Sequence, residues 1–443
     1  MISALKGYRS GTKEKIGDAV LFLIVTALSV LLLYSCGKRG GEEELSLQPD
    51  TAEDVSGTAE ETSSDGERRD YGFTAPEGYE FYCEIMLGSP AKGYVFKSLS
   101  RELADRYVEE YLSVLAGEGW RTVDRREAAR YLFVCLTDGE DALHLSFDRT
   151  ARRLRVIKDK ASRSVYSLED SLTGEREATL IQLDNDHTNS DVGMGYVICL
   201  KDGRYVLIDG GHSCDSEAEL IWETLASHSG GEKPVIAMWI VSHPHADHAG
   251  AFRRFAELHG KDVKLQALCV NDAVAYVPYN GEKAYSAASY AAFFDGARTV
   301  SPQTGDLITV GGVTFEFLYT FTDYYPSLPA CLNNTSLVVR ASAGLSAIFL
   351  GDIQTEAGNF LASMYGDHLK SDILQFAHHG YRNGASAEVY SFIGADIGLW
   401  PSSSSLYESL KDTAPAGKTA SGMKKVVLSD LGSFELSLEK AGE

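Results

Sequence analysis

Residues 241–250 have the sequence V-S-H-P-H-A-D-H-A-G and place four polar side chains within six positions: His243, His245, Asp247 and His248. They follow the apolar run 234–241, which predicts a buried strand that ends in a tight loop. Imidazole nitrogen and carboxylate oxygen are common ligands of zinc and similar divalent cations, so the cluster predicts a metal site. A solvated polar loop is the alternative, but it does not explain so many ligand types at this density.

Length and charge limit what surrounds the cluster. A chain of 443 residues has room for two or three domains, at about 100–200 residues each. Its formal net charge of −22 is strongly acidic. Such a surface repels polyanions, so the charge disfavours nucleic acid as a partner.

The amino terminus predicts a targeting segment over residues 1–36. An apolar run at 19–34 precedes Cys36 and follows four basic residues, Lys6, Arg9, Lys13 and Lys15. This order resembles a bacterial lipoprotein signal, in which Cys36 is lipidated. The alternative is an uncleaved membrane anchor, although about 16 apolar residues are fewer than the roughly 20 that span a bilayer. Both interpretations place the protein outside the bacterial cytoplasmic membrane and anchored to it.

Two further regions precede the cluster. Residues 37–70 contain four basic and eleven acidic residues with almost no large apolar side chain, and they predict a disordered acidic linker. Residues 71–162 predict a small α+β accessory domain, with a helix over 100–116 and an antiparallel meander over 131–157. His144 alternates with apolar neighbours there, which is typical of a hydrogen-bonded strand residue rather than a metal ligand.

From residue 178 to 443, predicted strands and helices alternate around the cluster. Strands at 195–200 and 205–208 predict a hairpin, and helices are expected over 216–226 and 246–258. Near the carboxyl terminus, residues 426–429 and 434–438 predict a closing hairpin across Asp430, Leu431 and Gly432. This order favours two β-sheets covered by helices on their outer faces, with loops of both sheets meeting along one edge.

Five motifs carry a family resemblance: I-D-G-G at 208–211, H-P-H-A-D-H-A-G at 243–250, N-N-T-S-L-V-V at 333–339, A-I-F-L-G-D at 347–352 and I-L-Q-F-A-H-H-G at 373–380. Together they resemble the metallo-β-lactamase-fold hydrolase superfamily, and most of all the soluble domain of ComEC-type DNA-uptake proteins. The resemblance covers about 178–438. It implies an α/β fold, an αββα sandwich with its metal site at the sheet edge.

The resemblance, together with the residue chemistry, assigns a role to each motif. Two divalent cations are expected, zinc by preference and manganese as an alternative. The expected metal ligands are His243 and His245 for one ion, Asp247 and His248 for the other, Asp352 as the bridging carboxylate and His378 to complete the second site. Asp209 is expected to orient the ligands and, with Asp247, to serve catalysis. The residues expected near the substrate or behind the ligands are His212, Asn334, Ser336 and His379.

One position departs from the family pattern. Many members carry a further histidine between the cluster and the bridging aspartate, but this chain has none between His259 and His368. The matching region contains Asn333, Asn334 and Ser336, whose amide and hydroxyl groups are weaker ligands. The sequence therefore leaves open whether one or two ions bind, and a turn is the alternative role for the asparagines.

The predicted function is an extracytoplasmic metal-dependent hydrolase that uses a metal-activated hydroxide. Phosphodiesters are the preferred substrate class because members of the superfamily that this chain resembles cleave phosphate esters. The expected partners are a small-molecule, nucleotide or cell-envelope phosphodiester, and the membrane through the N-terminal lipid or helix. The alternative is a non-catalytic surface lipoprotein in which the metal fold binds or senses a ligand.

Overall fold

The computed structural model describes residues 70–99, 104–168, 174–185, 192–271 and 284–440. The predicted signal or anchor and all but the last residue of the predicted linker lie outside these ranges. Among the described residues, no helix is both long enough and apolar enough to cross a membrane. The described residues contain a six-stranded sheet followed by two seven-stranded sheets.

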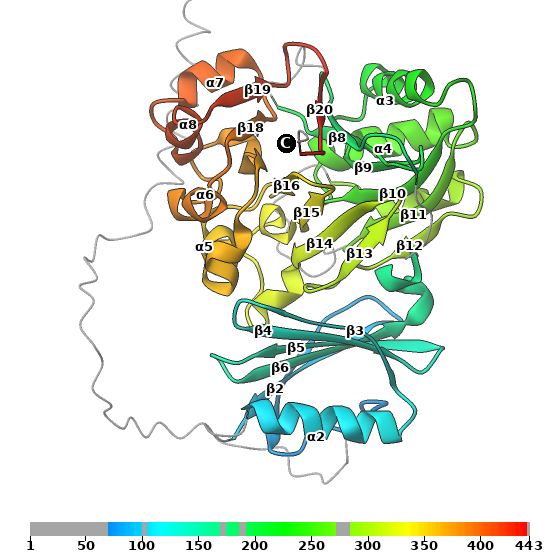
Figure 1. The fold of residues 1–443 in the computed structure, drawn as a ribbon, viewed down its shortest axis with the longest axis vertical. Helices are drawn as coiled ribbons and strands as arrows, with labels where there is room; N and C mark the ends of the chain where they lie inside the picture. The colour runs from blue at the N-terminus through cyan, green and yellow to red at the C-terminus, as the bar shows by residue number, and fades with distance from the viewer. Residues whose placement is uncertain (1–69, 100–103, 169–173, 186–191, 272–283, 441–443) are drawn as a thin grey trace, which may run out of the picture. The chain divides into compact units, whose positions relative to one another are not determined.

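The first sheet is antiparallel, with strand order β1-β2-β6-β5-β4-β3. Its strands are β1 (Tyr79–Ile85), β2 (Lys92–Ser98), β3 (Arg121–Ala128), β4 (Tyr131–Thr137), β5 (Asp141–Asp148) and β6 (Arg153–Lys160). Helix α2 (Ala104–Gly117) covers one face (Figure 1), where Val108, Tyr111 and Leu115 pack on apolar residues of the sheet. The structure thus has the expected small antiparallel sheet domain ahead of the region with the metal cluster.

The edge strand β3 is missing from the sequence-based prediction. Its residues, R-T-V-D-R-R-E-A, lack the alternation of apolar and polar side chains by which strands are recognised. The strand is held by its antiparallel backbone pairing with β4, and its exposed charged side chains pair with neighbours, Arg125 with Glu109 of α2 and Glu127 with Arg149. Charged side chains are a common way to keep an exposed edge from pairing with another chain.

The second domain contains two sheets of seven strands each. The first consists of β7 (Thr179–Gln182), β8 (Gly195–Cys199), β9 (Tyr205–Asp209), β10 (Val235–Val241), β11 (Lys264–Val270), β12 (Arg298–Val300) and β20 (Phe434–Ser437). The second consists of β13 (Leu307–Val310), β14 (Val313–Tyr319), β15 (Val338–Ser342), β16 (Ser346–Phe349), β17 (Ile373–Gln375), β18 (Ile397–Trp400) and β19 (Lys425–Leu428). The hairpin expected near residue 200 is present, as β8 and β9.

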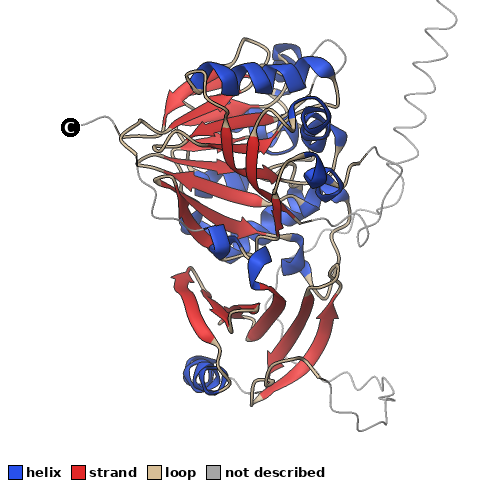
Figure 2. Ribbon diagram, turned by 90° about the vertical axis from the view of Figure 1, so that its right-hand side faces the viewer, coloured by secondary structure: helices blue, strands red, loops and turns tan. Residues whose placement is uncertain are grey.

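Three apolar clusters define the layers of this domain. Along β9, Val206 and Ile208 face the second sheet, while Tyr205 and Leu207 face α3 (Asp215–His228) and α4 (Ala246–His259). This alternation follows from the two-residue period of a strand. On the far side, the second sheet is covered by α5 (Thr355–Tyr365), α6 (Ala387–Ile393), α7 (Ser404–Leu410) and α8 (Pro415–Ala420). Helices therefore lie outside both stacked sheets (Figure 2), which confirms the expected αββα arrangement.

The closing hairpin predicted for residues 426–438 is wrong. Strand β19 pairs in parallel with β18 of the second sheet, whereas β20 pairs antiparallel with β7 of the first sheet. The connection near Asp430 is held to the start of α7, because this carboxylate accepts hydrogen bonds from the backbone and side chain of Ser404. The chain thus passes from one sheet to the other at the point where a local turn was expected.

The face of the small sheet opposite α2 packs on the second domain. The Phe133 ring lies against Gly305, which has a φ of 98° and no side chain to obstruct the ring. Arg126 Nε donates to the Gly305 carbonyl over 2.6 Å. His144 Nδ1 lies 3.0 Å from Asp306 Oδ1, which confirms that His144 is a hydrogen-bonded strand residue.

Candidate metal centre

The predicted site residues follow the carboxyl ends of neighbouring strands. Asp209 is the last residue of β9, and the loop after β10 carries His243 and His245 before α4 begins. Asp352 follows β16, and the pair 378–379 follows β17 in the short 3-10 helix η7 (Ala377–Gly380). Because β9 and β10 are parallel and β16 and β17 are parallel, these loops gather where the strands end.

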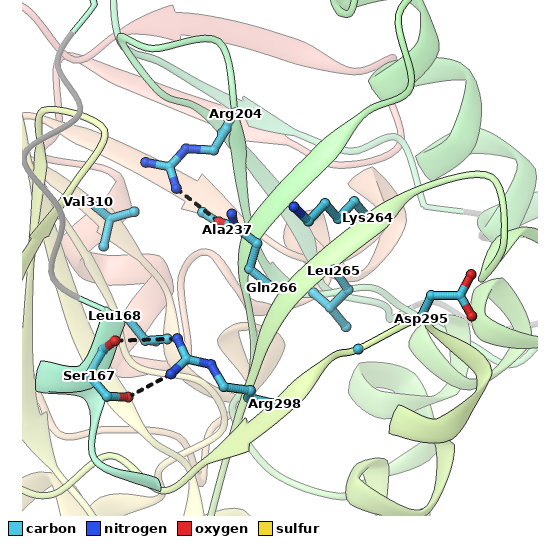
Figure 3. A pocket seen from close by; sticks show the side chains of 11 residues that line it. Ser167, Leu168, Arg204, Ala237, Lys264, Leu265, Gln266, Asp295, Arg298 and Val310 are labelled. Atoms are coloured by element: carbon cyan, nitrogen blue, oxygen red, sulfur yellow. Dashed lines mark hydrogen bonds between the residues drawn. The ribbon is translucent and has the colours of Figure 1, made fainter. Parts of the chain in front are cut away.

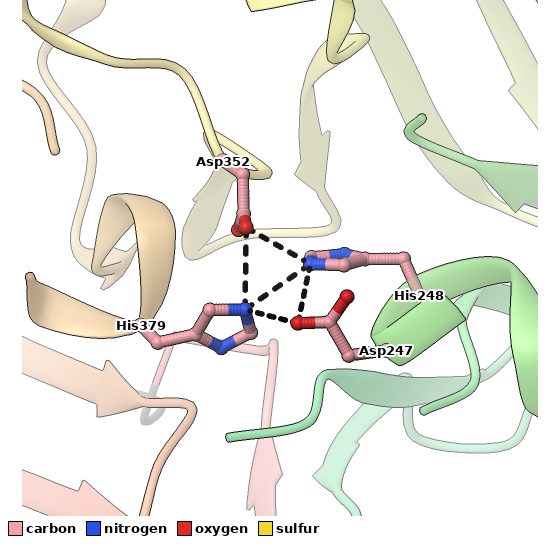
Figure 4. Close-up of side chains that lie close together, drawn as sticks. All are labelled: Asp247, His248, Asp352 and His379. Atoms are coloured by element: carbon pink, nitrogen blue, oxygen red, sulfur yellow. Dashed lines mark hydrogen bonds and ion pairs between the residues drawn. The ribbon is translucent and has the colours of Figure 1, made fainter. Parts of the chain in front are cut away.

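Four buried or half-buried side chains converge between the two sheets (Figure 4): Asp247, His248, Asp352 and His379. Their ligand atoms all lie within 4.8 Å of one another. Asp352 Oδ2 is 3.1 Å from His248 Nε2 and 3.2 Å from His379 Nε2. Asp247 Oδ2 is 3.0 Å from His379 Nε2 and, with a side-chain exposure of 21%, it is the most accessible member.

The protein orients both histidines of this group through their other ring nitrogen. Asp209 Oδ2 lies 2.9 Å from His248 Nδ1, and the Pro401 carbonyl oxygen lies 2.8 Å from His379 Nδ1. Since both partners are acceptors, each Nδ1 donates, and each Nε2 points into the group. This is the arrangement that proteins use behind metal-ligating histidines.

Charge in the group favours a cation at its centre. Burial lowers the pKa of His248, but Asp352, Asp209 and Asp247 outweigh burial and raise it well above its ordinary value. Burial likewise opposes the charged form of His379, yet Asp352 and Asp247 raise its pKa to about 10. The surrounding carboxylates therefore require positive charge at this position.

The group fits a bound divalent cation better than it fits hydrogen bonding alone. His248 Nε2 and His379 Nε2 face each other at 3.2 Å, and without a cation their raised pKa values mean that two N–H groups of like charge would point at each other. Asp352 Oδ1 is buried without a hydrogen-bond partner among the described residues, which is costly for a carboxylate oxygen. A cation held by two imidazoles and two carboxylates satisfies all of these atoms, and nitrogen and oxygen donors of this kind suit zinc.

A second set of donor atoms lies beside the first. His243 Nε2 is 3.0 Å from His245 Nδ1 and 4.0 Å from Asp352 Oδ2. Burial, followed by the neighbouring His248, lowers the pKa of His243 well below its ordinary value, so the ring is neutral and able to ligate. Asp352 therefore lies between two donor sets, as a bridging carboxylate would.

Comparison with known proteins agrees with this geometry. Residues 191–325 match the family model described as the metallo-beta-lactamase superfamily. The chain contains a metallo-beta-lactamase superfamily domain. The match includes the H-x-H-x-D-H cluster and ends before Asp352 and His379, which the structure adds to the site.

Two competence proteins are distant homologues of this domain. ComE operon protein 3 of Bacillus subtilis (strain 168) is 27% identical over 195 residues, which cover 41% of this chain and 23% of that protein. Competence protein ComA of Neisseria gonorrhoeae is 24% identical over 257 residues, covering 57% of this chain and 32% of that protein. The chain thus matches about a quarter to a third of the length of these relatives, and the resemblance to ComEC-type proteins is confirmed.

Solved structures also show similarity at low scores. CmlA, a diiron beta-hydroxylase from Streptomyces venezuelae, is 10% identical with a TM-score of 0.36, covering 59% of this chain and 54% of that chain. A Cronobacter sakazakii metallo-beta-lactamase with a HARLDQ motif is 18% identical with a TM-score of 0.28, covering 42% of this chain and 74% of that chain. Neither similarity adds evidence on the activity of this chain.

Within the metallo-beta-lactamase superfamily domain, His379 occupies the position that the sequence analysis assigned to His378. Both residues have left-handed backbone angles, with φ of 50° at His378 and 53° at His379, so the chain turns sharply between them. The turn buries the His379 ring against Asp352, whereas His378 Nε2 lies 3.1 Å from Asn333 Nδ2. Order along the sequence is therefore a poor guide to which ring enters the site.

Three other predicted residues lie behind the site. Asn334 accepts a hydrogen bond from Gln354 N and donates one to Glu356, so it braces the loop after Asp352. Ser336 Oγ accepts from the backbone N–H of Asp352 over 3.0 Å. His212 Nε2 lies 2.7 Å from the Val192 carbonyl oxygen, so this ring hydrogen-bonds to the backbone. In the position of the missing family histidine, the structure instead brings Asn333 next to His378.

Two supporting residues are absent from the sequence-based prediction. The backbone N–H and hydroxyl of Ser242 both donate to Asp209 over 2.7 Å, which fixes the carboxylate that orients His248. Pro401 contributes only its carbonyl oxygen to His379. Any residue can supply a backbone carbonyl, so the role of Pro401 could not be predicted from its residue type. Ser242 directly precedes His243 in the motif and could have been considered.

Proposed function

We propose that this chain is a metal-dependent hydrolase that acts on phosphodiesters. The observation that carries the proposal is the convergence of Asp247, His248, Asp352 and His379, in which both histidines are oriented from behind by acceptors. Structural polar clusters normally pair their donors with acceptors, whereas this group directs ring nitrogens and carboxylate oxygens at one point. Two divalent cations are proposed, one for each donor set, with Asp352 between them.

A divalent cation supplies Lewis acidity and an activated water at such a site, and a pair of cations suits the charge of a phosphoryl group. The protein's own contribution is orientation. Asp209 holds the ring of His248, and the Pro401 carbonyl holds His379. Asn333 and His378, whose side-chain nitrogens are 3.1 Å apart, form a polar pair beside the donor atoms. We propose that this pair contacts the substrate rather than a metal.

The proposed substrate is small. A net charge of −22 opposes the approach of a long polyanion, whereas a nucleotide or a cell-envelope phosphodiester carries few charges. The proposal keeps the extracytoplasmic location suggested by Cys36 and the preceding apolar run, with attachment to the cytoplasmic membrane by a lipid or a helix. Such a location would restrict the substrates to those outside the membrane.

Metal analysis combined with a hydrolysis assay tests the proposal. We expect the full chain, purified in mild detergent, to retain about one zinc or manganese ion after dialysis and to bind a second more weakly, because the donor set of His243 and His245 lacks a third histidine. It should hydrolyse bis(p-nitrophenyl) phosphate, and a chelator should abolish turnover. Asp352→Ala should lower both metal content and activity, because Asp352 serves both donor sets.

A histidine outside the site provides the matched control. His228 lies in the last turn of α3, where its ring contacts the Thr224 carbonyl, so His228→Ala should change neither metal content nor turnover. A folded chain that binds metal through Asp352 but hydrolyses no phosphodiester would favour the alternative of a binding or sensing module. A folded chain with no metal after reconstitution would overturn both the metal centre and the hydrolase.

A further inference from the structure

A second cavity lies at the opposite end of the strands that lead to the metal centre. It has a volume of about 460 Å³ and is lined by the starts of parallel strands (Figure 3). Lys264 is the first residue of β11, Arg298 is the first residue of β12, and Arg204 directly precedes β9. The orienting residue Asp209 instead ends β9, and the histidine cluster follows the last residue of β10, so the two sites are separated by the length of these strands.

The cavity has a surplus of positive charge. Among the described residues, no carboxylate pairs with Lys264 or Arg298. The one described carboxylate in the lining, Asp295, is paired with Lys261 at 2.6 Å. Unbalanced cations are notable in a chain with a net charge of −22. An anion in the cavity would balance them.

Both guanidinium groups are held in place before any ligand arrives. Arg204 donates to Asp202 Oδ2 through Nε and Nη2, at 2.8 Å and 2.6 Å, and Nη1 donates to Gln266 Oε1 at 2.9 Å. Arg298 donates to the hydroxyl and carbonyl oxygens of Ser167, each at 3.3 Å. Groups that are already ordered lose little conformational entropy on binding, so they favour recognition.

The remaining lining is apolar. Leu168, Leu265 and Val310 contribute side chains to the cavity, and all three residues are buried. An apolar surface next to fixed cations suits a molecule with an anionic end and an organic body. The volume is within the range of about 300–1,000 Å³ that is typical of small-molecule sites.

We propose that this cavity binds a phosphate-bearing small molecule, at a site separate from the metal centre. The guanidinium group of Arg298 and the ammonium group of Lys264, which pair with no carboxylate among the described residues, match the several oxygens and double charge of a phosphate better than a single carboxylate, while the charge of Arg204 is balanced by Asp202. The site does not depend on the proposed hydrolase activity. Its occupant is a ligand rather than the substrate, because none of the metal-centre residues lines the cavity.

Calorimetric titration with inorganic phosphate tests the proposal. The full chain in mild detergent is first freed of metal, and the chelator is dialysed away, so that phosphate cannot bind through a cation at the metal centre. Ionic strength is kept constant with sodium chloride. We expect saturable binding at one site, and we expect Lys264→Ala and Arg298→Ala each to weaken it by about tenfold or more, since each removes a charged hydrogen-bond donor.

Lys424→Ala is the control, because it removes one positive charge, as Lys264→Ala and Arg298→Ala do. Lys424 is an exposed lysine that pairs with Asp396 on the other half of the domain, so its loss should leave phosphate binding unchanged. Equal weakening by all three variants would show a general charge effect and overturn the site. Absence of saturable binding to the folded wild-type chain would also overturn it.

The sequence next to the cavity provides a second test. Glu169 and Asp170 follow Leu168 in the chain and lie outside the described residues. If the double variant Glu169→Gln, Asp170→Asn binds phosphate where the wild-type chain does not, these carboxylates are the anions that balance the cavity, and the proposal fails. Binding of similar strength by both proteins supports an external ligand.

Discussion

Asp209 Oδ2 lies 2.9 Å from His248 Nδ1, and both side chains are completely shielded from solvent. Asp209 also accepts two hydrogen bonds from Ser242, so its carboxylate cannot rotate freely. Its backbone has a φ of 53°, an uncommon value for a residue with a side chain. Uncommon backbone angles are often found at functional sites, where they hold a side chain in a required position. We therefore infer that Asp209 is a positioning residue for the candidate metal centre.

Replacing Asp209 with asparagine tests this role. The amide keeps the size of the side chain but loses the charge that His248 faces, so the ring is held less firmly. We expect Asp209→Asn to remain folded and to weaken zinc binding by about 10- to 100-fold, the usual effect of losing a group behind a ligand. Competition with a chromophoric chelator measures the affinity. Unchanged affinity would show that Asp209 is only structural.

The adjacent histidines after β17 should have different effects. His379→Ala removes a ring nitrogen that lies 3.2 Å from Asp352, so metal content should fall. His378→Ala removes a ring that lies beside Asn333, so metal content should remain while turnover of a phosphodiester falls by about tenfold or more. Elemental analysis of the two variants separates these roles. Loss of metal in His378→Ala alone would restore the assignment made from the sequence.

The left-handed turn at residues 378–380 should be sensitive to any added side chain. Gly380 has a φ of 79°, and a Cβ there would overlap the Trp400 ring. We expect Gly380→Ala to lower the free energy of unfolding by roughly 3 kcal/mol and to weaken metal binding through the displaced His379. Thermal unfolding and metal affinity are both measured.

Gly394 provides a matched glycine for this comparison. It has a φ of 59°, but the nearest atom to an added Cβ is the Ser391 carbonyl oxygen at 3.7 Å. Gly394→Ala should therefore lower the free energy of unfolding by about 1 kcal/mol, because alanine disfavours a left-handed backbone, and it should leave metal affinity unchanged. Equal losses in the two variants would mean that the Trp400 contact contributes nothing.

A buried charge cluster predicts how stability depends on pH. Glu316 Oε1 lies 2.6 Å from Arg126 Nη1 of the small sheet and 2.9 Å from His368 Nε2. Burial raises the pKa of Glu316, but the hydrogen bond with His368 and the charges of Arg126 and Arg340 outweigh it and lower the pKa well below the ordinary value. We expect Glu316→Gln to cost about 3 kcal/mol at pH 7, because it leaves the arginine charges unbalanced.

The difference between Glu316→Gln and the wild type should shrink in acid. A depressed pKa means that the stabilisation is complete above the unfolded-state value of about 4.3 and is lost as the pH falls from there towards the lower folded-state value. Thermal unfolding of both proteins between pH 7 and pH 3 measures this difference. Glu388→Gln, an exposed residue in the first turn of α6, is the control and should change little at any pH. A constant difference across the range would contradict the assignment.

The sequence predicts those parts of the fold whose signal is local. Apolar runs of four to seven residues mark β9, β10, β16 and β18, because buried strands must be apolar on both faces. The H-x-H-x-D-H cluster marks one side of the site because its ligands are neighbours in the chain. Asp352 needed the family resemblance, since an aspartate after an apolar strand has many other uses.

Other features depend on information that is not local. His378 and His379 are the same residue type in adjacent positions, and only the left-handed backbone decides which ring points at Asp352. Strands β19 and β20 flank a turn-forming sequence as a hairpin does, but their partners are β18 and β7, which lie far away in the chain. In both cases tertiary pairing overrides the local pattern.

The four converging ligands are divided between the two halves of the sandwich. Asp247 and His248 come from the helix that covers the first sheet, while Asp352 and His379 follow strands of the second. Neither half alone can offer more than two of these ligands. A bound cation would therefore link the two halves of the sandwich. Metal binding during refolding would then show when the two sheets come together.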